Sequence, residues 1–182
     1  MRLPEVSRTV EVPDDITLSL TGKVVSVKGA KGSITRDFSF APIEIASEGK
    51  NVRISAKWPR KKEAALVGTI YSHINNMIVG VTKGYSYKLK IVFSHFPITV
   101  KLQGKSLLVI ENFTGERRPR CVEILGGVKV QLEPEDIIIE GINLEDVSQT
   151  AANIEQSTKV RKKDPRVFLD GIYVYERNEG MA

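Results

Sequence analysis

The sequence predicts an α+β protein with two tandem duplicated domains, each an antiparallel or mixed β-sheet packed against one α-helix. The first observation is an internal repeat: Ile16-Thr-Leu-Ser-Leu-Thr-Gly-Lys-Val-Val-Ser-Val recurs as Ile98-Thr-Val-Lys-Leu-Gln-Gly-Lys-Ser-Leu-Leu-Val, at a constant offset of 82 residues. The second is that each half continues with a strand-like segment and then one amphipathic segment. We place the boundary after residue 82, which gives an N-terminal domain 1–82 and a C-terminal domain 83–182.

Each copy of the repeat has the pattern of a β-hairpin. Apolar and polar residues alternate before the Gly-Lys pair and apolar residues resume after it, as in two antiparallel strands joined by a tight turn. The first half continues through Asn51-Val-Arg-Ile-Ser, which predicts a short strand. A helix follows, because apolar residues lie three and four positions apart, and Gly80 is a plausible end. These apolar residues are Leu66, Val67, Ile70, Tyr71, Ile74, Met77, Ile78 and Val81.

The second half repeats this plan. Residues 85–93 alternate apolar side chains with serine and lysine, which predicts a half-buried strand with a cationic outer face. The run Asp136-Ile-Ile-Ile-Glu predicts a buried strand. Asn143 is suited to cap the next helix, whose first turn is acidic. The inward stripe of that helix consists of Val147, Ala151 and Ile154.

Composition restricts the class of protein. The chain has 182 residues, 41% of them hydrophobic, and a net charge of +5, so it can bury a core and leans weakly toward an anionic partner. Cys121 is the only cysteine, which excludes an internal disulfide and a thiolate metal cage and suits a reducing compartment such as the cytoplasm. We expect Cys121 to be buried in a strand. No segment has the apolar length of a signal peptide or membrane span, so no membrane association is expected.

The sequence offers little for catalysis. His73 and His95 are the only histidines, and the motifs of zinc proteases, serine hydrolases and nucleotide-binding proteins are absent. We therefore predict no catalytic residues, no metal site and no cofactor. His73 is expected to pack beside the first helix stripe, and His95 to shape a connection between strands.

A glycine-flanked run, Gly29-Ala-Lys-Gly32, has two interpretations. Glycines let backbone N–H groups approach an anion, so the run could cradle a phosphate. The alternative is a flexible hairpin loop. The nucleic-acid clamp of KH domains lies between helices, whereas strand-like sequence flanks this run, so a KH domain is excluded.

The strongest candidate for a binding site is the basic segment, residues 159–166. Its cations are Lys159, Arg161, Lys162, Lys163 and Arg166. The segment lies between the second helix and an apolar, aromatic final strand, and an acidic stretch at residues 133–146 contrasts with it. Cations held in place at both ends can match RNA phosphates at a smaller entropy loss than a free arm. A solvated loop is the alternative.

Three aromatic residues lie in or beside the final strand: Phe168, Tyr173 and Tyr175. They could stack on RNA bases. Burial of at least two of them against the sheet is the expected arrangement.

Two further basic clusters are predicted to contact phosphates. Lys57, Arg60, Lys61 and Lys62 surround Trp58 just before the first helix. A solvated helix entrance with Trp58 partly packed is the alternative. The second cluster lies in a loop with Pro119, where guanidinium groups suit phosphate geometry. It consists of Arg117, Arg118 and Arg120.

Three segments carry a family resemblance: Ser72-His-Ile-Asn-Asn-Met-Ile-Val-Gly-Val-Thr-Lys-Gly-Tyr-Ser-Tyr-Lys-Leu89, His95-Phe-Pro-Ile98, and Lys163-Asp-Pro-Arg-Val-Phe-Leu-Asp-Gly-Ile-Tyr-Val174. Together they resemble the large-subunit ribosomal protein six family in its archaeal and eukaryotic form. The resemblance runs through essentially the whole chain and includes the duplication. The last segment is the most specific.

The resemblance implies a structural constituent of the large ribosomal subunit in the cytoplasm, with a role in translation. It implies binding to large-subunit rRNA chiefly through the C-terminal domain, near the sarcin-ricin loop. Neighbouring ribosomal proteins and nearby translational GTPase factors are the other implied partners. The residues that match the family motif are Lys163, Arg166, Asp170, Gly171 and Tyr173, with Lys159, Arg161 and Lys162 beside them. The bacterial branch ends differently, so its contacts are not transferred.

Two other classes of function stay open on residues alone. A peptide- or protein-interaction module outside the ribosome could use the strand at residues 84–93 as a pairing edge. An enzyme is the least supported class. Gly171 is expected in a turn before the last strand, where a positive φ would require glycine.

Overall fold

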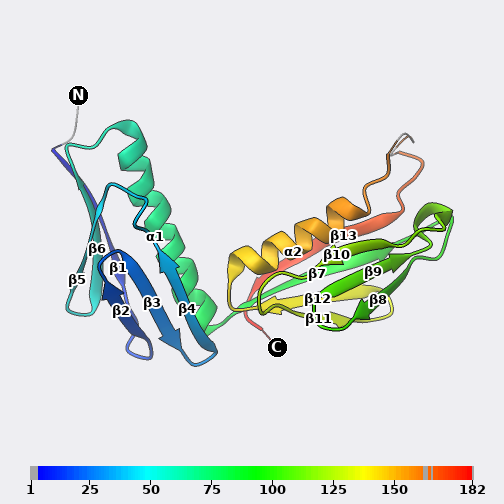
Figure 1. The fold of residues 1–182 in the computed structure, drawn as a ribbon, viewed down its shortest axis with the longest axis horizontal. Helices are drawn as coiled ribbons and strands as arrows, with labels where there is room; N and C mark the ends of the chain where they lie inside the picture. Colours follow the sequence, from blue (N-terminus) through cyan, green and yellow to red (C-terminus); the bar gives the residue numbers. More distant parts are fainter. Residues whose placement is uncertain (1–3, 162–163, 165, 182) are drawn as a thin grey trace. The chain divides into compact units, whose positions relative to one another are not determined.

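The computed structural model describes residues 4–161, 164 and 166–181. The chain forms two compact units, Met1–Lys83 and Gly84–Ala182, and in each unit a helix lies along β-strands (Figure 1).

The N-terminal unit contains two three-stranded sheets and one helix. One sheet has the order β1-β6-β5 and the other β2-β3-β4, and helix α1 contacts both. The elements are β1 (Glu5–Glu11), β2 (Thr17–Thr21), β3 (Val24–Gly29), β4 (Gly32–Asp37), β5 (Glu44–Glu48), β6 (Asn51–Lys57) and α1 (Lys61–Thr82).

The C-terminal unit contains a four-stranded sheet, β11-β12-β7-β13, and a three-stranded sheet, β10-β9-β8. Helix α2 contacts β7, β10, β12 and β13. The elements are β7 (Tyr85–Val92), β8 (Thr99–Gln103), β9 (Leu107–Glu111), the 3-10 helix η1 (Phe113–Gly115), β10 (Arg120–Glu123), β11 (Lys129–Leu132), β12 (Asp136–Gly141), α2 (Leu144–Ser157) and β13 (Gly171–Glu179).

The two units share one topology, which confirms the predicted fold class. Strands β1 to β6 and helix α1 correspond in chain order to β7 to β12 and α2, and the sheets β1-β6-β5 and β7-β12-β11 have the same neighbours. All strand pairs among the described residues are antiparallel. The C-terminal unit differs by strand β13, which pairs with β7 from Gly171 opposite Val92 to Glu179 opposite Tyr85.

Strand β7 is therefore a central strand, paired with β12 on one side and β13 on the other. The alternative in which residues 84–93 offer a pairing edge is wrong, because β13 occupies that edge. The cationic outer face of β7 is also engaged: Lys88 pairs with Glu176 at 2.8 Å and Lys90 with Glu135 at 3.0 Å.

Both predicted hairpins are confirmed, and the glycine of each Gly-Lys pair has a positive φ, +64° at Gly22 and +69° at Gly104. Thr21 lies opposite Val24, whereas Gln103 lies opposite Leu107, so the second hairpin has a longer loop. The repeated sequence thus keeps the turn glycine in both copies and lets the loop length vary.

The helices bury most of the predicted stripes, although Leu66 and Tyr71 of the first are only half-buried. Helix α1 buries Val67, Ile70, Ile74, Met77, Ile78, Gly80 and Val81. It continues past Gly80 to Thr82 and is followed by Gly84 at φ +76°, so the stop lies later than expected. At the start of α2, the Asn143 side chain accepts a hydrogen bond from the backbone N–H of Glu145 at 3.2 Å, which confirms the predicted cap.

Helix α1 is, within the described part of the chain, long and apolar enough to be a candidate membrane span. The sequence-based statement that no segment has this character was too strict. A buried helix of a core meets the same criteria, and α1 packs against β1, β3 and β6. We therefore interpret it as the core helix of the N-terminal unit.

The Gly29–Gly32 run is the tip of the β3–β4 hairpin and packs on the end of helix α1. Gly29 lies opposite Gly32, and the Lys31 backbone N–H donates to the Val81 carbonyl at 3.0 Å. That N–H is thus engaged within the protein, which counts against a phosphate cradle. The same hydrogen bond fixes the loop to helix α1, which counts against a flexible hairpin loop.

Replacing Gly29 by alanine is expected to lower the free energy of unfolding by about 1 to 3 kcal/mol, as measured by urea denaturation. A Cβ atom at this position would lie 2.8 Å from the Val81 carbonyl oxygen and 2.8 Å from its Cγ2, and backbone cannot move aside cheaply. Gly127→Ala is the matched control, because no heavy atom lies within 4 Å of its Cβ position. Equal stability of the two variants would contradict this packing.

Candidate nucleic-acid interface

The basic segment begins and ends at the same part of the C-terminal core. Thr158, 2% exposed, accepts a hydrogen bond at its hydroxyl from the Ile172 backbone N–H at 3.0 Å. The same hydroxyl donates to the Glu155 carbonyl at 3.1 Å. The end of α2 is thereby tied to the start of β13, so the basic segment is held at its base.

Asp170 is a second anchor. It is 1% exposed, and it accepts hydrogen bonds at Oδ1 from the backbone N–H groups of Ser94 and His95. Its Oδ2 lies 2.9 Å from His95 Nδ1. Burial alone would raise the pKa of Asp170, but these hydrogen bonds outweigh it and lower the pKa. An ionised carboxylate therefore joins the connection after β7 to the start of β13.

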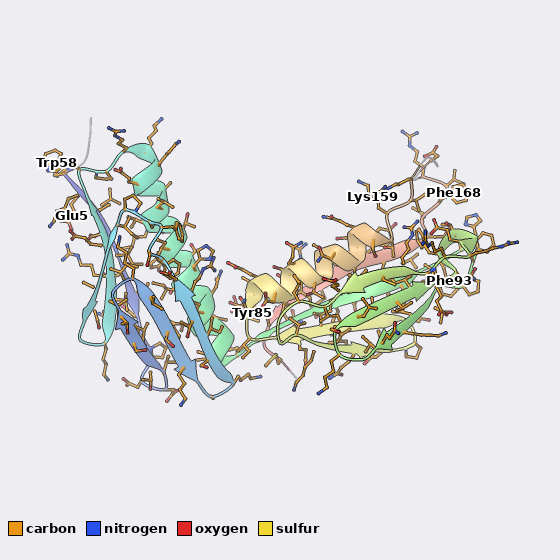
Figure 2. The ribbon with its side chains drawn as sticks, viewed as in Figure 1. Glu5, Trp58, Tyr85, Phe93, Lys159 and Phe168 are labelled. Atoms are coloured by element: carbon orange, nitrogen blue, oxygen red, sulfur yellow. The ribbon has the colours of Figure 1, made fainter. Side chains whose placement is uncertain are left out.

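The anchoring extends to Phe168 through an aromatic contact. The rings of His95 and Phe168 stack with centroids 4.8 Å apart and planes at 30°. Before Phe168, Asp164 closes a turn: its Oδ1 accepts from the Arg166 backbone N–H at 2.9 Å, and its carbonyl accepts from Val167 and Phe168. Figure 2 shows Lys159 and Phe168 on the two arms of this loop.

The cations of the basic segment are exposed where the structure describes them. Lys159, Arg161 and Arg166 are exposed and form no ion pair with a described carboxylate. Lys162 and Lys163 lie outside the described residues. Lys88 of β7 is exposed to a lesser degree and is paired with a carboxylate. Its hydrogen bond to Glu176 raises the pKa of Lys88, and the negative charge of Glu176 offsets its positive charge.

The aromatic residues are more exposed than predicted. Tyr173 is 42% exposed and Tyr175 is 53% exposed, so burial of at least two of the three is wrong. Phe168 and Tyr173 line a groove of about 470 Å³ beside the end of α2. The remaining lining residues are Glu155, Gln156, Thr158, Lys159 and Val160.

Gly171 has a different role from the predicted one. It is buried as the first residue of β13, not in a turn, and its φ is not positive. A Cβ atom there would lie 3.0 Å from the Tyr173 ring and hydroxyl, whose hydroxyl donates to the Leu169 carbonyl at 3.2 Å. Gly171 thus leaves room for the Tyr173 ring to fold back over the chain.

In the Arg117–Arg120 cluster, the structure separates the three arginines. Arg117 and Arg118 are exposed. Arg120 instead donates to both carboxylate oxygens of Glu116, at 2.9 and 2.6 Å, and to the Ser157 carbonyl, and its guanidinium lies 4.3 Å from the centre of the Phe113 ring. Its bonding partners are within the protein, so Arg120 holds this loop against the end of α2.

The N-terminal cluster surrounds an exposed aromatic residue. Trp58 is 65% exposed with φ +48°, a backbone region that bulky residues rarely adopt, and its N–H donates to the Pro4 carbonyl at 2.9 Å. Trp58 is thus mostly exposed, and a solvated helix entrance stays an alternative to a phosphate contact. Exposed cations lie around it: Lys57, which approaches Glu44 at 3.7 Å, and Arg60, Lys61 and Lys62.

Sequence reasoning missed two features of the C-terminal unit. His95 was expected only to shape a connection, whereas it joins Asp170 to Phe168. The sequence signal that could have revealed this contact is Asp170, a carboxylate followed by glycine in an otherwise apolar run. Cys121 is exposed, because its neighbour Val122 takes the inward position in β10, so its predicted burial is wrong.

Among the described residues, no group of three His, Cys, Asp or Glu side chains comes together as around a metal ion. His73 packs on Phe38, with ring centroids 6.3 Å apart, and its Nδ1 lies 3.2 Å from Arg36 Nη1, which confirms its packing role.

Comparison with known proteins gives one consistent result. The sequence profile of ribosomal protein L6 matches residues 12–84 and 96–171. The large ribosomal subunit protein uL6 of Desulfurococcus amylolyticus is 50% identical over 182 residues, covering 99% of this chain and 99% of that protein. That of Methanosarcina mazei is 46% identical over 173 residues, covering 95% and 98%. That of Aeropyrum pernix is 50% identical over 173 residues, covering 94% of each.

Proposed function

Because this chain belongs to the ribosomal protein L6 family, in its archaeal branch, and is thus a constituent of the large ribosomal subunit, we propose that it binds large-subunit rRNA chiefly through residues 84–182. One observation carries this proposal. Exposed cations at Lys159, Arg161 and Arg166 lie on a loop whose base is fixed by Thr158 and Asp170. The role of the protein in translation is structural.

The fixed base of the loop makes these cations suitable for a defined RNA. Most hydrogen bonds to nucleic acids go to phosphates, which set the register of the protein on the RNA. A segment anchored at both ends loses less conformational entropy on binding than a free arm. Lys162 and Lys163 add two charges to the same sequence segment, and Arg117 and Arg118 form a second exposed pair in this unit. Arg120 acts by positioning the latter loop.

The N-terminal unit has its own candidate contact at the start of helix α1. Arg60, Lys61 and Lys62 lie at the positive end of the helix dipole, where cations are unfavourable. The Glu63 carboxylate accepts from the Arg60 backbone N–H at 2.6 Å and offsets part of this charge. A phosphate group would be attracted both to the cations and to the helix end, so these residues form a second RNA contact.

The family resemblance supports a position near the sarcin-ricin loop, with neighbouring ribosomal proteins and translational GTPases close by. No reaction is involved. Cations neutralise phosphates, and the β-sheets of each unit hold its basic residues in a fixed arrangement. A protein-interaction module outside the ribosome loses its main support, since β13 covers the edge of β7.

The direct test is binding of the full chain to a transcript of archaeal large-subunit rRNA. About three to five phosphate contacts, at about −0.9 each, predict that log K falls with log salt concentration with a slope of about −2.7 to −4.5. Filter binding at several salt concentrations measures this slope. A transcript of small-subunit rRNA is the control. Equal affinity for both transcripts, or an affinity independent of salt, would contradict the proposal.

A further inference from the structure

We propose that the groove between the end of helix α2 and strand β13 binds one unpaired base of the large-subunit rRNA, which stacks on Tyr173 and Phe168. This inference rests on the proposed function and adds a specific ligand to it. The groove has a volume of about 470 Å³, within the range of about 300–1,000 Å³ found for small-ligand sites.

The two aromatic walls are fixed before any ligand arrives. Phe168 stacks on His95, which Asp170 holds at 2.9 Å. Tyr173 folds over Gly171 and donates its hydroxyl to the Leu169 carbonyl at 3.2 Å. Each ring is thus held by contacts within the protein, and 42% of Tyr173 is still exposed. Supported, exposed rings favour stacking, because binding restricts their conformational freedom very little.

The rest of the groove matches the chemistry of a nucleotide. Lys159 contributes to its lining, so a phosphate attached to the bound base meets positive charge. Arg161 and Arg166 are further exposed cations in the same basic segment. Gln156 and Glu155 supply polar groups that can hydrogen-bond to a base edge. A purely apolar protein side chain would use neither feature, so charge complementarity favours the nucleotide.

The test compares four variants of the full chain in binding to the archaeal large-subunit rRNA transcript. Tyr173→Leu and Phe168→Leu remove the stacking surfaces, whereas Tyr173→Phe retains the ring. Tyr175→Leu is the matched control, because Tyr175 lies on the same strand, is 53% exposed and does not line the groove. Dimethyl sulfate probing reports which unpaired bases the protein protects, and far-UV circular dichroism monitors folding.

Each leucine variant at the groove is expected to weaken binding about 5- to 150-fold, the range for removal of one stacked base. Tyr173→Phe and Tyr175→Leu are expected to stay within about threefold of the wild type. The salt slope should not change in Tyr173→Leu, since stacking releases no counterions. One base protected by the wild type should become reactive. Should Phe168→Leu fail to fold, the exposed Tyr173 still decides the outcome.

Failure of this inference differs from failure of the proposed function. If the wild type binds with the expected salt slope but Tyr173→Leu matches Tyr175→Leu in affinity and base protection, the groove does not hold a base. The same result is expected if a side chain of a neighbouring protein, and not an RNA base, occupies the groove. If the wild type does not bind the transcript, both proposals are overturned.

Discussion

Replacing Lys159 and Arg161 together by glutamate is expected to weaken binding to large-subunit rRNA at least about tenfold at about 0.15 M salt. Both side chains are exposed on the anchored basic segment. The salt slope should become shallower by about 0.9 for each phosphate that the protein no longer neutralises, so the double variant should have a slope shallower by about 2. The new carboxylates would also repel phosphates. Filter binding over a range of salt concentrations measures both quantities.

The matched control is Lys105→Glu with Lys129→Glu. These lysines are exposed in the same unit, form no ion pair with a described residue, and undergo the same change in charge. We expect the affinity to fall by less than about threefold, since these lysines lie outside the basic segment and exposed charges that do not contact RNA are screened at this salt concentration. Equal reductions in the two double variants would show that net charge, and not the anchored segment, determines binding. Incorporation into large subunits should follow the same order.

The elements that the sequence predicted well depend on local properties. A turn glycine with positive φ, as at Gly22 and Gly104, and a cap such as Asn143 act on the residues beside them. The stripe of helix α1 repeats within a single helix. Because each property is complete within a short segment, reading along the chain reveals it, and the repeat then predicts two similar units.

The features that were missed depend on partners far apart in sequence. Strand β7 resembles an edge strand until β13 pairs with it, and Gly171 lies opposite Val92 only after the chain has folded. Asp170 reaches Ser94 and His95 across a similar separation. Alternation shows that a strand has two faces but does not assign the core face, which explains the wrong predictions for Cys121 and Tyr173.

Asp170→Ala is expected to lower the free energy of unfolding of the C-terminal unit by about 2 to 4 kcal/mol. The variant removes a charged acceptor that is 1% exposed and leaves the backbone N–H groups of Ser94 and His95 without it. Asp164→Ala is the control, because Asp164 is exposed and serves one local turn, and a decrease below about 1 kcal/mol is expected. Urea denaturation, with hydrogen exchange to follow each unit separately, measures the difference. Equal decreases would contradict the anchor.

The stabilisation by Asp170 should also depend on pH in one direction. Its pKa is lowered in the folded state from the ordinary 3.8, so its contribution is present above that value and is lost as the pH falls through the lower folded value. Asp170→Asn keeps the shape of the side chain but cannot ionise. The difference in unfolding free energy between wild type and Asp170→Asn should therefore stay constant from about pH 7 to about pH 5 and shrink below about pH 4. Equal unfolding free energies of wild type and Asp170→Asn at neutral pH would mean that the shape of the side chain, and not its negative charge, holds His95 and the basic segment in place; a difference that persists undiminished in acid would contradict its assignment to ionisation of Asp170.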